Sequence, residues 1–218
     1  MADGEHPIIF APPAMRAAYL TAADDLVGMV TDAAAAIGPE GWDAPGLGVW
    51  SLRSLIGHAG RALATVTAYL DAGVGRPIEV EHAFDYFAVL LTAQADPGAV
   101  AERGRQAGLE LGDDPVTAVM QLRDDALAAV KAVADDAPAA SPAGVMRLSD
   151  YLVSRVFELT IHTGDVARAA GVEFVPARDP AMITLTVLGA LVAARPGASD
   201  VIAALTGRGA LPEGYSTL

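Results

Sequence analysis

The chain has 218 residues, and its 14 Lys and Arg against 27 Asp and Glu give a formal net charge of −13 at pH 7. This acidic balance argues against binding to nucleic acids and anionic membranes, both of which require a basic patch, and we expect neither as a partner. Hydrophobic residues make up 53%, enough for a core. Cysteine is absent, which excludes a disulfide scaffold and a cysteine nucleophile and leaves His, Asp and Glu as metal ligands.

The amino-terminal residues are acidic and broken by prolines, unlike a signal peptide. The longest strongly apolar stretch, residues 181–194, is shorter than the roughly 20 residues that span a bilayer. We therefore expect a cytoplasmic protein in which this stretch forms a buried helix.

Two long helices are predicted in the first third of the chain. The first begins at Pro12 and Pro13 and is stopped by Gly38-Pro39, and the second begins near Trp50 with Ser51 as its N-cap. The apolar residues that recur at helical steps are Met15, Tyr19, Ala22, Leu26, Met29 and Ala33 in the first, and Leu52, Leu55, Ala59, Leu63, Val66 and Leu70 in the second.

The remaining chain also has helical periodicity, and we see no strand pattern of any length. The composition of residues 137–144 (APAASPAG) is typical of a flexible connection. For the last long helix, Ser149 is a candidate cap and Gly171 the stop. The further predicted helices are short ones at 81–94 and 98–108, long ones at 115–134 and 148–170, and two at 180–194 and 199–206. Four long helices in one domain predict an all-α helix bundle, a fold that places sites on facing helices in its interior.

The helix predicted at 148–170 carries a polar stripe. Its members follow one another at steps of four, three, four and three, so they share one face: Tyr151, Arg155, Glu158, His162 and Asp165. One interpretation is a solvated face with Arg155–Glu158 ion pairs, since charged residues are mostly exposed. The other is a site in the bundle interior, where Glu158 and His162, one turn apart, present a carboxylate and an imidazole to one ion.

A third ligand would have to come from another helix. His58 lies beside the apolar stripe of the second helix, where a histidine is either a hydrogen-bonded core residue or a ligand. His6 and His82 have no partner at metal-ligand spacing, and we expect neither to belong to a site.

Two segments resemble the signatures of a known family. GWDAPGLGVWSLRSLIGHAGR (41–61) and ELTIHTGDVARAAG (158–171) are similar, in sequence, order and separation, to those of the mycothiol-dependent maleylpyruvate isomerase metal-binding domain family. The ending ALTGRGALPEGYS resembles the tail of many actinobacterial members. The resemblance implies a DinB-like four-helix bundle over residues 1–170, with residues 171–218 as a short helical extension packed on it.

The resemblance also implies a site. It assigns His58, Glu158 and His162 as ligands of a divalent ion, zinc above all, and mycothiol as co-substrate. We expect Asp165 to orient a ligand imidazole, and Arg155 to hold a substrate carboxylate as a catalytic residue. Thr65 and Tyr69 are expected to line the cofactor pocket. Two departures stand out: residues 171–218 are too few for the family's catalytic C-terminal domain, and Gly164 replaces a common Trp.

The resulting hypothesis is a metal-dependent, mycothiol-dependent transferase or isomerase acting on a small electrophilic substrate. Because the chain has no cysteine, the nucleophilic thiol would come from the co-substrate. One alternative is a non-catalytic metal-binding bundle, either a stress protein or a small-molecule-binding protein. The other is a structural or homodimeric bundle in which residues 181–194 form the subunit interface.

Overall fold

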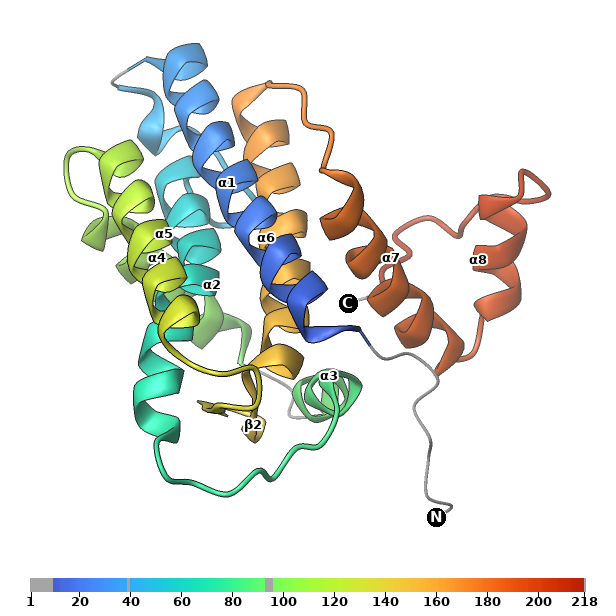
Figure 1. The fold of residues 1–218 in the computed structure, drawn as a ribbon. Helices are drawn as coiled ribbons and strands as arrows, with labels where there is room; N and C mark the ends of the chain where they lie inside the picture. Colours follow the sequence, from blue (N-terminus) through green and yellow to red (C-terminus); the bar gives the residue numbers. More distant parts are fainter. Residues whose placement is uncertain (1–9, 39, 93–95, 218) are drawn as a thin grey trace.

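The structure is a computed structural model that describes residues 10–38, 40–92 and 96–217. Helices dominate it, so the all-α class predicted from the sequence is confirmed (Figure 1). The elements in chain order are α1 (Pro12–Ile37), the short 3-10 helix η1 (Gly41–Asp43), α2 (Leu52–Gly73), α3 (Ala83–Thr92), α4 (Pro97–Glu110), α5 (Pro115–Ala132), β1 (Pro138–Ser141), β2 (Gly144–Arg147), α6 (Leu148–Ala170), α7 (Arg178–Ala193) and α8 (Ala198–Leu205).

The four long helices α1, α2, α5 and α6 form the bundle. α1 packs along α6 and α5, and α2 packs against α4, α5 and α6. All the residues of the apolar stripes predicted for the first two helices are buried, among them Tyr19, Leu26 and Leu63. The 3.6-residue periodicity therefore identified the faces that meet in the core.

The ends of the helices follow local rules in most places. The Ser51 side chain accepts a hydrogen bond from the Ser54 backbone N–H, as predicted for an N-cap. Gly171 ends α6 in the left-handed conformation, with φ of 69°. The prediction for Ser149 was wrong: Arg147 is the N-cap of α6, and the Ser149 N–H donates to the Asp135 carbonyl at 3.0 Å.

The segment predicted as a flexible connection is instead part of an antiparallel β-hairpin, in which Pro138 pairs with Arg147 and Ser141 with Gly144. Its strands have four residues each, too few for a visible alternation in the sequence. The hairpin packs closely on the end of α2, because a Cβ on Gly73 would lie 2.1 Å from the Pro138 carbonyl oxygen. Tertiary contact therefore orders a stretch whose composition is typical of linkers.

Glycines bring α2 and α4 into backbone contact. A Cβ on Gly57 would lie 2.2 Å from the Gly108 nitrogen, and one on Gly108 would lie 2.8 Å from the Ser54 Cα. A Cβ on Gly104 would lie 2.7 Å from the Trp50 ring. No side chain larger than hydrogen fits at Gly57 or Gly108 without separating the two helices, and a side chain at Gly104 would displace the Trp50 ring.

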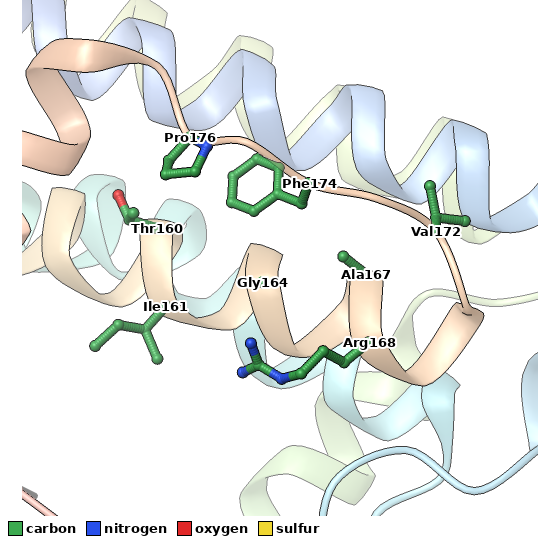
Figure 2. A pocket seen from close by; sticks show the side chains of 8 residues that line it. All are labelled: Thr160, Ile161, Gly164, Ala167, Arg168, Val172, Phe174 and Pro176. Atoms are coloured by element: carbon green, nitrogen blue, oxygen red, sulfur yellow. The ribbon is translucent and has the colours of Figure 1, made fainter. Parts of the chain in front are cut away.

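The carboxyl-terminal region extends from the bundle. α7 packs on α6 and α1 and buries Ile183, Val187 and Leu191, whereas α8 contacts α7 and buries none of its residues. The segment that joins α6 to α7 runs back along α6 and leaves a pocket of about 350 Å³ beside Gly164, Arg168 and Phe174 (Figure 2). Among the described residues, no helix is both long and apolar enough to cross a membrane.

Candidate metal centre

The polar stripe of α6 faces the bundle interior. Tyr151 is 0% exposed, and Arg155 and Asp165 are each 7% exposed. The side chain of Glu158 is 31% exposed to solvent, and that of His162 is 15% exposed. The interpretation of this stripe as a solvated face is therefore wrong.

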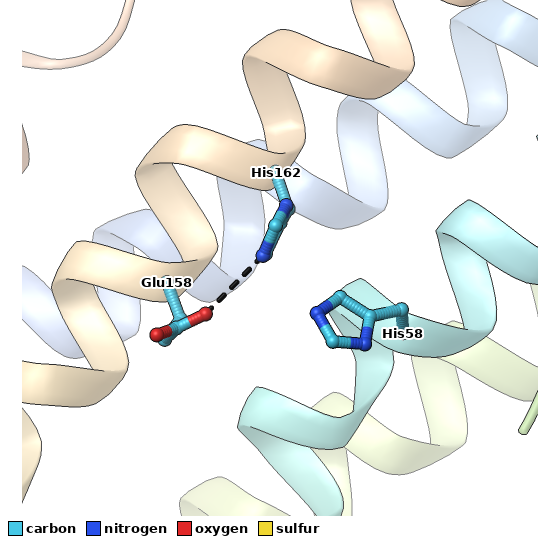
Figure 3. Close-up of side chains that lie close together, drawn as sticks. All are labelled: His58, Glu158 and His162. Atoms are coloured by element: carbon cyan, nitrogen blue, oxygen red, sulfur yellow. Dashed lines mark ion pairs between the residues drawn. The ribbon is translucent and has the colours of Figure 1, made fainter. Parts of the chain in front are cut away.

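Three potential ligands converge between α2 and α6. Glu158 and His162 point from α6 toward His58, which comes from α2 on the other side (Figure 3). One nitrogen of each histidine and one carboxylate oxygen all lie within 4.8 Å of one another. The His162 Nε2 is 3.2 Å from the Glu158 Oε2, and the two imidazole rings meet edge to face with their centroids 4.7 Å apart.

Hydrogen bonds fix the orientation of His162. Its Nδ1 lies 2.9 Å from the Asp165 Oδ2, and the other Asp165 oxygen accepts a hydrogen bond from Arg168. Burial alone would lower the pKa of His162, but the hydrogen bonds to Asp165 and Glu158 outweigh it and raise the pKa to about 9. Burial alone would raise the pKa of Glu158, but the hydrogen bond with His162 and the charge of Arg155 lower it to about 2.

The environment of His58 differs. Its Nδ1 is buried and has no hydrogen-bond partner among the described residues. Its ring lies against Trp50, with the centroids 4.4 Å apart, and the Trp50 Nε1 donates to the Ala101 carbonyl of α4 at 2.9 Å. Burial, with the charge of His162, lowers the pKa of His58 to about 4. The imidazole is therefore neutral at pH 7, the form in which it can bind a metal.

A cavity of about 600 Å³ opens beside the three potential ligands. Thr65, Tyr69 and Arg155, all selected from the sequence, line it together with His58 and Glu158. The sequence analysis missed the other polar lining residues, which are Arg61, Tyr86 and Arg103. Arg61 follows His58 by one helical turn, a signal that could have been used, whereas Tyr86 and Arg103 come from α3 and α4 and share no periodicity with the site.

Arg155 is held by neutral groups. Its Nη2 donates to the Tyr86 hydroxyl at 2.8 Å and its Nε to the Ser154 Oγ at 3.1 Å. Its guanidinium lies 4.7 Å from the centre of the Tyr151 ring. Within the described ranges no ion pair of 4.0 Å or less joins Arg155 to Glu158, so the pair expected from their spacing does not form. The buried charge remains available to an anion in the cavity.

Of the two histidines expected to lie outside the site, His6 is not among the described residues. His82 lines a different pocket, together with Phe10 and Asp150. Over the part of the chain that the structure describes, one group of potential ligands lies close enough to hold a single ion, and it consists of two imidazoles and one carboxylate. This donor chemistry fits a divalent ion such as zinc, and three protein ligands leave room for an exogenous one.

The sequence was compared with known families and proteins. Residues 23–167, well over half of the chain, match the family described as Mycothiol maleylpyruvate isomerase N-terminal domain. This range includes His58, Glu158 and His162. No curated protein and no solved structure gives a significant match. The match confirms the resemblance seen in the two signature segments, and the chain belongs to the mycothiol maleylpyruvate isomerase N-terminal domain family.

Proposed function

We propose that this protein is a divalent-metal-dependent enzyme that uses mycothiol as co-substrate and either conjugates it, through its sulfur, to a small electrophilic substrate or uses it to isomerise that substrate. The observation that supports it most strongly is the convergence of His58, Glu158 and His162 beside a cavity large enough for a small molecule, which His58 and Glu158 line. Family membership supports the choice of mycothiol.

The proposed ligands of the metal are the imidazoles of His58 and His162 and the carboxylate of Glu158. A bound zinc ion in such a set lowers the pKa of a coordinated thiol or water and so supplies a nucleophile at neutral pH. The chain has no thiol of its own, so we assign the nucleophilic sulfur to mycothiol. The reaction is addition of this sulfur to an electrophilic carbon, followed by loss of a leaving group or by rotation and elimination of the sulfur.

The chain's own residues would bind and orient the reactants. Arg155, fixed by Tyr86 and Ser154, presents a buried cation that suits a carboxylate of the substrate. Arg61 and Arg103 add two further cations to the cavity lining. Positive charge is thus concentrated at this cavity, although the chain as a whole has a net charge of −13. Such focusing favours an anionic substrate.

Two hydroxyl groups on α2 line the same cavity and suit a polyhydroxylated thiol. The Thr65 Oγ1 lies 2.9 Å from the Tyr151 hydroxyl, and this hydrogen bond holds the Thr65 side chain in place. Tyr69 lies beside Tyr151, with ring centroids 5.7 Å apart. We assign both residues to binding of the co-substrate, and we place the reaction in the cytoplasm.

The test begins with metal content, measured by plasma mass spectrometry on tag-free protein and on a His58→Ala, His162→Ala double variant. We expect about one divalent ion per parent chain and none in the variant, since the double variant leaves one ligand. Mycothiol consumption is then followed with a series of anionic and uncharged electrophiles. A metal-loaded parent that consumes no mycothiol would be a non-catalytic metal-binding bundle, and a parent that takes up no zinc would exclude both functions.

A further inference from the structure

We propose that Arg168 is a positioning residue for the metal centre, and that it acts on His162 through Asp165. The inference rests on the proposed function, because it concerns the geometry of a ligand in the proposed set. It is carried by a chain of contacts that starts at the protein surface and ends at His162.

The first contact is between Arg168 and Asp165. The Arg168 Nη2 donates to the Asp165 Oδ1, while the Asp165 Oδ2 lies 2.9 Å from the His162 Nδ1. Both carboxylate oxygens are thus occupied, one by the guanidinium and one by the imidazole. A carboxylate held at both oxygens cannot rotate without breaking one of these contacts.

Burial makes the contact more than a surface ion pair. The Asp165 side chain is 8% exposed, whereas that of Arg168 is 74% exposed. Exposed ion pairs contribute little to folding stability. Arg168 has a different effect here, since it fixes the orientation of the nearly buried Asp165 carboxylate. Its positive charge also balances the negative charge of that carboxylate.

The Asp165 carboxylate in turn determines which nitrogen of His162 is available. With the Nδ1 engaged by Asp165, the Nε2 faces Glu158 and the position of an ion between the three ligands. Loss of Arg168 would free Asp165 to adopt other rotamers, and His162 would lose its fixed partner.

Gly164 provides the space that Arg168 needs. The guanidinium is directed back along α6 toward Gly164 (Figure 2). A Cβ on Gly164 would lie 3.6 Å from the Arg168 Nη1 and 3.8 Å from the Phe174 Cδ1, both ordinary contacts. Alanine therefore fits at this position, but a longer side chain would compete with the guanidinium for the same space.

The test measures zinc affinity by chelator competition in the full-length protein. We expect Arg168→Gln to weaken zinc binding by about tenfold, within the range typical of groups that orient a metal ligand. Arg178→Gln, which removes an equal charge from an exposed site on α7, should leave affinity unchanged. Arg168→Lys, which keeps the charge, should restore part of the loss.

A double-mutant cycle separates positioning from a general effect of charge. In an Asp165→Asn background, Arg168→Gln should cause no further loss, because the intermediary has already gone. Gly164→Leu should mimic Arg168→Gln with the charge retained, and Gly164→Ala should resemble the parent. Equal losses of affinity in the presence and absence of Asp165, or no loss in Arg168→Gln, would overturn the inference.

A metal-free readout distinguishes failure of this inference from failure of the proposed function. In protein labelled with ¹⁵N-histidine, the Nδ1–H signal of His162, identified by its absence in His162→Ala, should be protected from solvent exchange. We expect Arg168→Gln to abolish the protection and Arg178→Gln to preserve it. If the parent binds no zinc, the proposed function fails, and this signal still decides the role of Arg168: unchanged protection in Arg168→Gln rejects it.

Discussion

The two helices that carry the proposed metal ligands position these side chains in different ways. On α6, a line of hydrogen bonds from Arg168 through Asp165 and His162 to Glu158 sets the direction of each group. On α2, His58 has a buried Nδ1 without a partner among the described residues, and its ring lies against Trp50. Polar substitutions on α6 should therefore affect the site more than changes to the packing around His58. The following predictions are arranged from the largest expected effect to the smallest.

Removal of a ligand should have the largest effect. We expect His162→Ala to weaken zinc binding by more than the roughly 10–100-fold that loss of an orienting group costs, because a direct bond to the ion is lost. His82→Ala is the matched control, since His82 lines a separate pocket. Chelator competition measures both, and equal affinities in the two variants would show that the ion is not bound by this set.

Removal of the orienting carboxylate should come next. Asp165→Asn keeps the shape of the side chain but removes the charge that faces His162 and Arg168. We expect zinc affinity to fall by about 10–100-fold. Asp179→Asn, an exposed substitution in the first turn of α7, is the control. An effect of Asp165→Asn no greater than that of the control would mean that His162 needs no fixed partner.

The pH dependence of zinc binding should distinguish the two histidines. In the metal-free protein the pKa of His162 is raised to about 9 and that of His58 lowered to about 4, so at pH 7 His162 is doubly protonated and charged, whereas His58 is neutral. Binding should therefore release about one proton, and affinity should rise about tenfold per pH unit in the neutral range and level off above pH 9. Titration calorimetry in buffers of different ionisation enthalpy measures the proton count. Release of two protons below pH 7, where a zinc-bound water keeps its protons, would show that His58 is also charged.

The same pKa shift has a consequence for the metal-free fold. The pKa of His162 is higher in the folded protein than its ordinary value of 6.5. This group therefore favours the folded state most strongly below pH 6.5, and its contribution disappears as the pH rises through about 9. His162→Ala should remove this part of the pH dependence of urea denaturation.

Packing around His58 should have the smallest effect. Trp50→Phe retains an aromatic ring next to His58 but loses the hydrogen bond from Nε1 to the Ala101 carbonyl. We expect the free energy of unfolding to fall by about 1 kcal/mol and zinc affinity to fall less than tenfold. Urea denaturation and chelator competition measure the two quantities. A loss of affinity greater than that of Asp165→Asn would reverse the comparison between α2 and α6.

Periodicity made the bundle predictable, and it also grouped the α6 residues of the site. The residues from Tyr151 to Asp165 share a face because helical geometry repeats every 3.6 residues, whatever the tertiary structure. Whether that face meets water or a second helix depends on the neighbours, which is why the solvated interpretation was open until the fold was known.

The features that the sequence did not predict all depend on tertiary contacts. Tyr86 and Arg103 reach the cavity from α3 and α4, whose placement follows from how they pack on α6 and α2. The strands of the hairpin are too short to show alternation, and they are ordered by the end of α2 and by the Glu79 carboxylate, which accepts from the Val145 N–H. Ser149 has the right side chain for a cap, but the strand β2 leads directly into α6 and makes Arg147 the first residue outside the helix.

The backbone contact between Gly57 and Gly108 fixes how far α4 can lie from α2. Val100 and Arg103, which line the cavity from α4, are therefore held at a set distance from His58, by this main-chain contact and by the Trp50 ring that lies between His58 and α4. Replacing those two residues should change the chemistry of the cavity wall without changing its width. The α4 face of the cavity is thus the place where substitutions should alter which small molecules the cavity admits, while the three proposed metal ligands stay in place.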